Sequence, residues 1–293
     1  MSHSLPGFLF TKLHGLGNDF VLLDFLPGSP RIAGGGLHPT ELSSQLIRKL
    51  GDRRFGVGFD QLLVLRPMDP HRDDSSLTVM DIYNPDASVA EMCGNGVRAA
   101  GLYLSRYHPQ RALRVQTLGG LKELTQDAQD PSVFTVLMGE PRFASGSTGT
   151  ERLELISQVG AQPIEFRAVD MGNPHAVTWM RDVAGFPLEV IGPQVETHPR
   201  FPNRTNFEII EKTGSHSLRV RVWERGAGIT LACGTGACAS VVAAIAEDPS
   251  WEGQWIQVEL PGGSLQIRWA GPGSPVEMKG PATEVFQGRF VDG

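Results

Sequence analysis

The stretch Glu91-Met92-Cys93-Gly94-Asn95-Gly96 has a counterpart in the second half of the chain, Leu231-Ala232-Cys233-Gly234-Thr235-Gly236. Both contain the motif Cys-Gly-polar-Gly, and each motif is followed by a small-residue run that is compatible with a helix, Val97 to Gly101 and Ala237 to Ala246. The chain has only three cysteines, so two matched motifs 140 residues apart indicate a duplicated unit. We expect the two halves to face each other across one site.

A cysteine placed directly before a helix is favourably positioned for proton transfer. The first N–H groups of a helix lack internal partners and carry partial positive charge, which favours a thiolate and lowers the cysteine pKa. The same N–H groups suit a carboxylate, and the flanking glycines allow the backbone to approach a ligand closely. Two such cysteines on opposite sides of an α-carbon could remove a proton from one face and return one to the other. This chemistry is cofactor-free racemisation or epimerisation of an amino acid.

Three other interpretations of the cysteines are less consistent with the sequence. A lone buried cysteine often behaves as a small hydrophobe, which is how we interpret Cys238 inside the apolar run. A disulfide between Cys93 and Cys233 is disfavoured by the count of three cysteines and by the lack of a signal peptide. A zinc site is disfavoured because the chain has no Cys-x-x-Cys and no histidine within four residues of either motif cysteine.

Composition limits the classes of function. The 293 residues allow one large domain or two ordinary ones, and 40% hydrophobic residues with 20% charged residues predict a substantial core. The net charge of −6 and the lack of a basic stripe argue against nucleic acid as a partner. Residues 1–9 contain no secretory signal, and the longest apolar run, Val241 to Ala246, is too short to span a membrane. We therefore expect a cytoplasmic protein with reduced thiols.

The pattern of β-forming residues predicts many short strands in each half, and the residues after each cysteine motif predict one central helix per half. This combination indicates two similar α+β domains. The helices are predicted at Pro39 to Leu50 with Thr40 as a possible N-cap, Val97 to Tyr107, Thr150 to Val159 and Gly236 to Ala246. The small, polar stretch Ser145 to Gly149 is a candidate linker.

Five stretches, in order, resemble the diaminopimelate epimerase family over nearly the whole chain. They are Lys12-Leu13-His14-Gly15-Leu16-Gly17-Asn18-Asp19-Phe20, Gly56-Val57-Gly58-Phe59-Asp60-Gln61, Cys93-Gly94-Asn95-Gly96-Val97-Arg98, Gly172-Asn173-Pro174-His175-Ala176-Val177 and Glu224 to Gly236. The resemblance implies two pseudo-symmetric barrel-like domains, each a mixed or antiparallel sheet wrapped around a central helix, with the active site in the inter-domain cleft. The domain limits it implies are 1–138 plus 281–293 and 139–280.

The resemblance also implies a function. Members of this family are isomerases that interconvert LL- and meso-diaminopimelate in lysine and peptidoglycan-precursor biosynthesis. They use a thiolate base and a thiol acid, with no cofactor and no metal. The expected partner is therefore a small-molecule substrate, with neither nucleic acid nor membrane, and a homodimer is expected.

The site residues follow from the matched positions. Cys93 and Cys233 match the thiolate and thiol pair, and His175 and Glu224 match residues that flank the reacting centre. The helix-start residues that would hold the reacting carboxylate are Gly94, Asn95, Gly234 and Thr235. The polar set that would bind the substrate, mostly at its distal end, is Asn18, Gln61, Asn84, Asn173, Asn206 and Arg225.

Two residues depart from the family pattern. Ala87 stands where the family usually has Gly, which suggests a slightly different turn before Cys93 without loss of activity. Phe286 falls where some members have a Tyr at the dimer contact.

Three other functions fit the sequence less well. A proline or hydroxyproline racemase-like enzyme also uses paired thiols, but the polar set, especially Asn206 and Arg225, favours a substrate with a second amino-acid end. The isomerases of the phenazine pathway type share the fold but lack the cysteine pair, whereas this chain has both cysteines. A thiol redox or binding module would leave Glu224, His175 and the asparagine set without a purpose.

Overall fold

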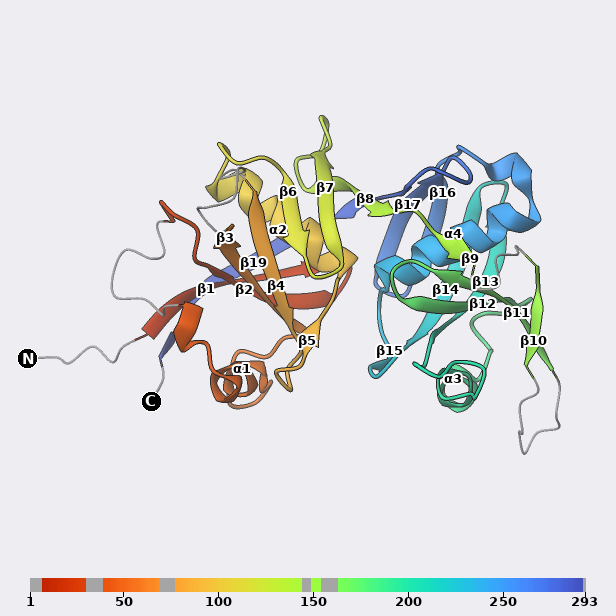
Figure 1. Cartoon of the computed structure of the whole chain (residues 1–293), viewed down its shortest axis with the longest axis horizontal. Helices are drawn as coiled ribbons and strands as arrows, with labels where there is room; N and C mark the ends of the chain where they lie inside the picture. Colours follow the sequence, from red (N-terminus) through yellow and green to blue (C-terminus); the bar gives the residue numbers. More distant parts are fainter. Residues whose placement is uncertain (1–6, 30–38, 69–76, 144–148, 154–162, 292–293) are drawn as a thin grey trace, which may run out of the picture. The chain divides into compact units, whose positions relative to one another are not determined.

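The computed structural model describes residues 7–29, 39–68, 77–143, 149–153 and 163–291, and its chain forms two units (Figure 1). Unit 1 comprises Met1–Val136 and Pro281–Gly293, and unit 2 comprises Leu137–Gly280. The chain passes from unit 1 into unit 2 within the strand β8 (Val133–Gly139) and returns at the end of β18 (Val276–Pro281).

Unit 1 is a mixed sheet around one helix. Besides β8, its strands are β1 (Gly7–Gly15), β2 (Asn18–Asp24), β3 (Gln61–Pro67), β4 (Thr78–Tyr83), β5 (Val89–Ala90), β6 (Arg114–Thr117), β7 (Gly120–Gln126) and β19 (Thr283–Val291). Its helices are η1 (Pro39–Glu41), α1 (Ser44–Gly51) and α2 (Gly94–Tyr107). The sheet pairs in the order β19-β1-β2-β3-β4-β6-β7-β8, and β5 adds to β4. The pairs β2–β3 and β4–β6 are parallel, and the others are antiparallel.

Unit 2 is built in the same way. Besides β18, its strands are β9 (Arg142–Phe143), β10 (Glu151–Leu153), β11 (Ile164–Asp170), β12 (Pro174–Trp179), β13 (Asn206–Gly214), β14 (Ser217–Glu224), β15 (Gly228–Ile229), β16 (Ile256–Leu260) and β17 (Gly263–Trp269). Its helices are α3 (Leu188–Glu196), α4 (Gly234–Glu247) and η2 (Pro249–Trp251). The sheet pairs in the order β9-β11-β12-β13-β14-β16-β17-β18, β15 adds to β14, and β12–β13 and β14–β16 are parallel.

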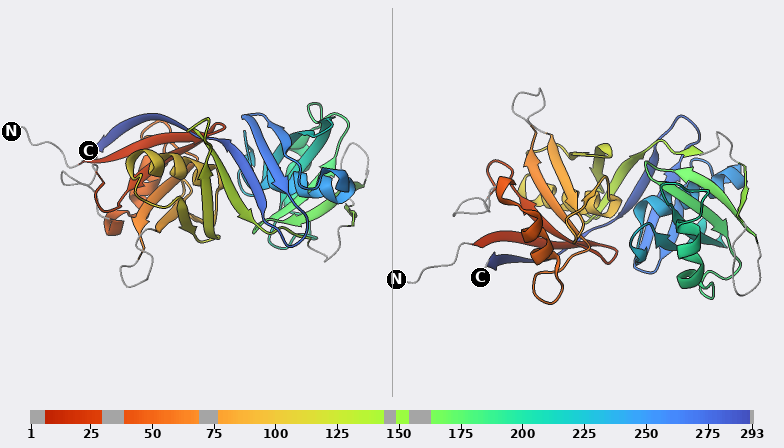
Figure 2. Two further views of the ribbon diagram at one scale, coloured as in Figure 1. Left: turned by 90° about the horizontal axis from the view of Figure 1, so that it is seen from above. Right: turned by 60° about the horizontal axis from the view of Figure 1, so that its bottom comes forward.

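The strand orders of unit 1 and unit 2 match position by position, so the chain contains an internal repeat. Each repeat takes its first strand from the other half of the sequence. β19 follows β18 in the chain but pairs with β1 in unit 1, and β9 follows β8 but pairs with β11 in unit 2. Both views of Figure 2 show β19 running beside β1 near the two ends of the chain.

One helix occupies the centre of each unit. Every residue of α2 from Gly94 to Leu104 is buried, and α2 contacts β1, β2, β3, β7 and β19. Every residue of α4 from Gly234 to Ile245 is buried, and α4 contacts β11, β12, β13, β14 and β17. A helix that is buried on all sides needs small or apolar residues throughout, which explains the Ala- and Gly-rich runs after both cysteine motifs. The predicted α+β class, with a mixed sheet around a central helix in each repeat, is confirmed.

One predicted helix is shorter than expected, and another is wrong at its start. The helix expected at Pro39 to Leu50 is a short 3-10 turn followed by α1, and its N-cap is Ser43, whose hydroxyl accepts a hydrogen bond from Leu46 N at 3.2 Å. The helix expected at Thr150 to Val159 begins instead as the strand β10, which pairs with β11. Residues 154–162 and 144–148, which include most of the expected linker, lie outside the described residues. None of the helices in the described part of the chain is long and apolar enough to cross a membrane.

Candidate active site

The predicted site residues fall into two groups, one in each unit, and the repeat relates them. Half-site 1 comprises Asn18, Gln61, Asn84, Cys93, Gly94 and Asn95. Half-site 2 comprises Asn173, His175, Asn206, Glu224, Arg225, Cys233, Gly234 and Thr235. The strand registers make Asn18 equivalent to Asn173, Gln61 to Asn206, and Asn84 to Glu224. His175 and Arg225 have the apolar counterparts Phe20 and Pro85. Half-site 2 is therefore the more strongly polar of the two.

Both cysteines are helix N-caps. Cys93 has extended backbone angles and its Sγ accepts a hydrogen bond from Gly96 N at 3.4 Å, at the start of α2. Cys233 caps α4 in the same way, with Gly236 N at 3.4 Å. The predicted placement of each sulfur at the start of a central helix is therefore confirmed. None of the three cysteines, all of which lie in the described part of the chain, forms a disulfide.

The packing leaves little room for a side chain at the glycine three residues after each cysteine. A Cβ at Gly236 would lie 2.7 Å from Glu208 Oε1 and 3.3 Å from Cys233 Sγ. A Cβ at Gly96 would lie 3.1 Å from a methyl carbon of Leu63. These glycines let the strand beneath the helix approach closely, which keeps the helix-start N–H group within reach of the sulfur.

Half-site 1 consists mainly of amide side chains. Asn18 Oδ1 lies 3.6 Å from Cys93 Sγ and 3.4 Å from Asn95 Nδ2. The buried guanidinium of Arg98 donates to Asn95 Oδ1 at 2.7 Å, which turns the NH₂ group of that amide toward Asn18. Gln61 donates to Asn84 Oδ1 at 3.3 Å. Each amide therefore has a defined orientation beside the partly buried Cys93.

Half-site 2 contains two carboxylates and a histidine around Cys233. The carboxylate of Glu224 accepts a hydrogen bond from the hydroxyl of Thr230. His175 Nδ1 lies 2.7 Å from Glu208 Oε1, and its Nε2 lies 3.0 Å from Asn173 Oδ1. Sequence reasoning missed both: Glu208 lies outside the matched stretches, and Thr230 lies inside the stretch Glu224 to Gly236 but was assigned no role. The sequence signal for Thr230 was its position six residues after Glu224 in the same matched stretch.

Asn206 and Arg225 lie at the edge of half-site 2. Asn206 Nδ2 donates to Pro174 O at 3.0 Å, and its Oδ1 accepts from Arg225 N at 2.9 Å. The amide of Asn206 thus ties the start of β12 to the turn after β14. The guanidinium of Arg225 donates to Asn203 O at 3.3 Å. Glu196 also supports this turn, because its carboxylate accepts from Gly226 N at 3.0 Å and Trp223 Nε1 at 2.7 Å.

The electrostatics of Cys233 differ from the sequence prediction. Burial raises the pKa of the Cys233 thiol well above its ordinary value, and the negative charges of Glu224 and Glu208 raise it further. The hydrogen bonds from Thr235 and Gly236 oppose this effect but are outweighed. The lowered pKa that we predicted from the helix start is therefore wrong for this cysteine, because desolvation opposes the charged form more strongly than one backbone N–H favours it. Burial also raises the pKa of Glu224.

A family model described as diaminopimelate epimerase matches residues 10–144 and 167–285, which include both half-sites. The chain belongs to the diaminopimelate epimerase family. Among its relatives, the diaminopimelate epimerase of Stutzerimonas stutzeri (strain A1501) is 42% identical over 286 residues, covering 96% of this chain and 98% of the relative. The diaminopimelate epimerase of Magnetococcus marinus is 45% identical over 290 residues, covering 96% of each chain. The resemblance seen in the sequence is thus confirmed.

More distant solved structures show the same fold as this diaminopimelate epimerase family member. A hydroxyproline epimerase from Agrobacterium vitis matches with a TM-score of 0.68 at 15% identity, covering 97% of this chain and 91% of that one. A phenazine biosynthesis protein of the PhzF family from Bacillus anthracis matches with a TM-score of 0.66 at 14% identity, covering 98% and 100%. At these identities the likeness concerns the fold alone.

Proposed function

We propose that this protein interconverts LL- and meso-diaminopimelate without a cofactor, with Cys93 and Cys233 as the two proton-transferring groups. The observation that carries the proposal is the equivalence of the two cysteines, each of which caps the central helix of its own repeat through the same Gly-polar-Gly start. Membership of the diaminopimelate epimerase family supports the choice of substrate.

In the proposed reaction both half-sites act on one substrate. One sulfur, as the thiolate, takes the α-proton, and the other, as the thiol, gives a proton to the opposite face of the carbon. The reacting carboxylate would be held by the helix-start residues Gly94, Asn95, Gly234 and Thr235, whose N–H groups favour an anion. The raised pKa of Cys233 suits it to the role of acid in the resting enzyme, because it keeps its proton near neutral pH.

The remaining residues are assigned to the ammonium and distal groups of the substrate. Glu224 and His175 would position the reacting ammonium group and tune proton transfer. Arg225 would clamp the distal carboxylate, since a guanidinium can bind a carboxylate through two parallel hydrogen bonds. The amides assigned to the rest of the substrate are Asn18, Gln61, Asn84, Asn173 and Asn206. We further propose that closure of the two units on the substrate excludes water from the carbanion-like state.

The proposed setting is the cytoplasm, in lysine and peptidoglycan-precursor biosynthesis. The proposed assembly is a homodimer, and exposed apolar side chains on β19 support it. Phe286 is 48% exposed and Val285 is 55% exposed, and Leu9 on the neighbouring strand β1 is also exposed. Large apolar side chains that remain exposed on a strand are candidates for burial against another surface.

The test is solvent deuterium incorporation at the α-carbon of LL-diaminopimelate, under reducing conditions and without added cofactor. We expect deuterium to enter as the meso isomer forms, and we expect conversion to be lost in Cys93→Ala and in Cys233→Ala. Cys238→Ala is the matched control, because Cys238 lies in α4, five residues after Cys233, and has no assigned role in the reaction. Exchange with proline or hydroxyproline and not with diaminopimelate would overturn the substrate assignment.

A further inference from the structure

Glu208 on β13 is a buried carboxylate beside half-site 2. Its side chain is completely buried, and its Oε1 lies 2.7 Å from Nδ1 of His175, whose side chain is equally buried. Among the described residues, Glu208 Oε2 has no hydrogen-bond partner and is itself buried. A carboxylate in such a place costs folding free energy, so its presence calls for a functional reason.

The repeat provides an internal comparison for this pair. In unit 1, the positions equivalent to His175 and Glu208 are Phe20 and Leu63, as the matching registers of β2–β3 and β12–β13 show. Phe20 and Leu63 are both fully buried and apolar. The same place in the same fold is therefore filled by two hydrophobic side chains, and the polar pair in unit 2 is not needed to form the sheet or to pack it against the helix.

A continuous line of polar contacts leads from Glu208 to the sulfur of Cys233. His175 Nε2 lies 3.0 Å from Asn173 Oδ1, and Asn173 Nδ2 lies 3.3 Å from Thr235 Oγ1. Thr235 Oγ1 in turn lies 3.5 Å from Cys233 Sγ, and either atom of that last contact can be the donor. Glu208 is one end of this line and the sulfur is the other.

The line can be hydrogen-bonded in two directions. In the structure the NH₂ of Asn173 donates to Thr235 Oγ1 and the Asn173 oxygen faces His175 Nε2, so Nε2 carries a proton and the Thr235 hydroxyl can donate to a Cys233 thiolate. If Cys233 is a thiol, its S–H donates to Thr235, the amide of Asn173 is turned over to accept from the Thr235 hydroxyl, and its NH₂ donates to an unprotonated Nε2. In both directions His175 Nδ1–H donates to Glu208, so the carboxylate is the fixed end.

We propose that Glu208 is a positioning residue for the epimerisation, which holds the Nδ1 proton of His175 and thereby sets the hydrogen-bond line that ends at the Cys233 sulfur. The proposal rests on the proposed role of Cys233 as a proton-transferring group. The charge of Glu208 also acts directly, because it disfavours the Cys233 thiolate and keeps the sulfur ready to give a proton.

Other charged groups also lie near Cys233, and the test must separate their effects on its pKa from the effect of Glu208. Burial, then the charge of Glu224 on β14, then that of Glu208 on β13 raise the pKa of Cys233. His175 on β12 faces the same carboxylates. On the other two strands that contact α4, Arg167 on β11 pairs with Glu247 near the far end of the helix, and Arg268 on β17 pairs with Glu277. Removal of the Glu208 charge alone should therefore shift the reactivity of Cys233 toward lower pH.

The first experiment measures the alkylation of each cysteine by iodoacetamide as a function of pH, with mass spectrometry to separate the two sites. In Glu208→Gln, the amide oxygen can still accept the Nδ1 proton but the charge is gone. We expect the alkylation of Cys233 at a fixed pH near 8 to be about threefold to tenfold faster than in the wild type, which corresponds to about half a pH unit to one pH unit. Cys93 lies in the other unit and should react at the wild-type rate.

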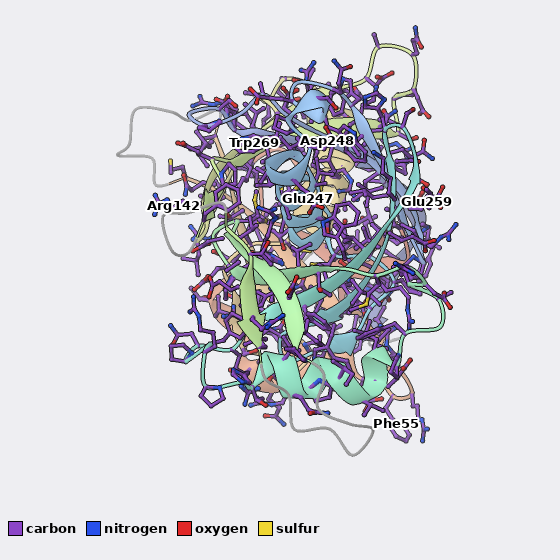
Figure 3. All side chains as sticks on the ribbon, turned by 90° about the vertical axis from the view of Figure 1, so that its right-hand side faces the viewer. Phe55, Arg142, Glu247, Asp248, Glu259 and Trp269 are labelled. Atoms are coloured by element: carbon purple, nitrogen blue, oxygen red, sulfur yellow. The ribbon has the colours of Figure 1, made fainter. Side chains whose placement is uncertain are left out.

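Two controls make the result decisive. Glu259→Gln removes the same charge from the surface of unit 2, where Figure 3 shows Glu259 at the edge of the molecule, and it should leave both cysteines unchanged. Glu208→Asp keeps the charge, so the pH at which alkylation of Cys233 begins should stay close to that of the wild type. An unchanged rate at Cys233 in Glu208→Gln, or equal acceleration at both cysteines, would overturn the proposal.

A second measurement uses the wild type and so does not depend on the folding of a variant. In protein labelled with ¹⁵N-histidine, His175 should keep a proton on Nδ1 in its neutral form, with the ¹⁵N shift of a protonated ring nitrogen. A neutral His175 ring whose proton lies on Nε2 would refute the role of Glu208. Neither experiment needs turnover of diaminopimelate, so failure of this proposal is distinguishable from failure of the proposed substrate.

Discussion

Asn18 Nδ2 donates to Asp60 Oδ2 at 3.0 Å, and this hydrogen bond turns the oxygen of the Asn18 amide toward the sulfur of Cys93. Asp60 also accepts from Asp19 N at 3.0 Å and from Arg53 Nη2 at 2.6 Å. The loop that leads into β3 is thus tied to the residue that contacts the first cysteine. In half-site 1, as in half-site 2, a carboxylate outside the predicted site holds a predicted site residue in one orientation.

Asp60→Ala should reduce catalytic efficiency without unfolding the protein. The Asn18 amide would lose the acceptor that orients it, and a hydrogen bond to a charged group contributes about 1.5 kcal/mol or more, so kcat/KM should fall about tenfold. Steady-state kinetics with LL-diaminopimelate measures the change. Asp81→Ala, which removes the partner of Arg66 in the same unit, is the control and should retain nearly full activity. Equal losses in the two variants would contradict the orienting role.

Ala87→Gly should stabilise the protein. Ala87 has a φ of +69°, in the left-handed region that costs a residue with a Cβ about 1–2 kcal/mol. Glycine removes that cost but adds entropy to the unfolded chain, so we expect a net gain of about 0.5–1 kcal/mol in the free energy of unfolding. Urea unfolding measures it. Ala90→Gly, in the neighbouring strand β5, should instead destabilise the protein, and a loss of stability in Ala87→Gly would refute the strain.

Asp19→Asn should lower the free energy of unfolding at neutral pH and should lower it less in acid. Burial raises the pKa of Asp19, but the hydrogen bonds and charges of Arg53 and Lys12 outweigh it and lower the pKa from 3.8 to about 2. Because the folded-state pKa is depressed, this stabilisation is present above pH 3.8 and is lost as the pH falls toward 2. After allowance for solvent screening, we expect a loss of about 1–2 kcal/mol at pH 7.

Urea unfolding of Asp19→Asn and of the wild type at pH 7 and at pH 3 tests this linkage. The difference between the two proteins should shrink at the lower pH. Glu165→Gln removes a carboxylate from the exposed pair with Arg152 and should change stability little at either pH. A constant difference for Asp19→Asn across this range would show that its effect is not the loss of a charged carboxylate.

Phe286→Asp should convert the proposed dimer to a monomer. The exposed ring of Phe286 packs edge-on against Phe10 within the chain, at 5.9 Å between ring centroids, so part of it is free to contact a second copy. A charge at the centre of an apolar contact is costly to bury. Light scattering after gel filtration would report the molar mass. Leu118→Asp, at an exposed apolar position away from β19, should leave the mass unchanged.

The cysteine motifs predicted more of the structure than any other feature. They correctly predicted the duplication and a central helix after each cysteine, because a helix start with its glycines is a local pattern that a short stretch can encode, although α2 and α4 begin at Gly94 and Gly234 rather than at Val97 and Gly236. The helix predicted over Thr150 to Val159 failed at its beginning, since pairing with β11 outweighed the local propensity of Glu151 to Leu153. The N-cap of α1 was displaced because Thr40 and Ser43 are both capable caps and only the packed structure selects between them.

Sequence reasoning did not predict Glu208 and Asp60, which orient site residues, for a different reason. Glu208 lies in the apolar stretch Asn206 to Ile210, and its partner His175 is 33 residues away in the chain. Asp60 and Asn18 are 42 residues apart. Such pairs are brought together by the parallel strand pairs β12–β13 and β2–β3, which local periodicity does not reveal.

The strand exchange between the repeats has a consequence for how the chain can be divided and completed. Gly7 pairs with Val291, so the outer edge of β1 is covered only by β19, which lies at the opposite end of the described chain. A cut in the chain after β8 would leave the amino-terminal piece without β19, although it would hold every residue of half-site 1. The two pieces of such a split protein should recover activity only when mixed, because β19 on one piece completes the sheet of the other.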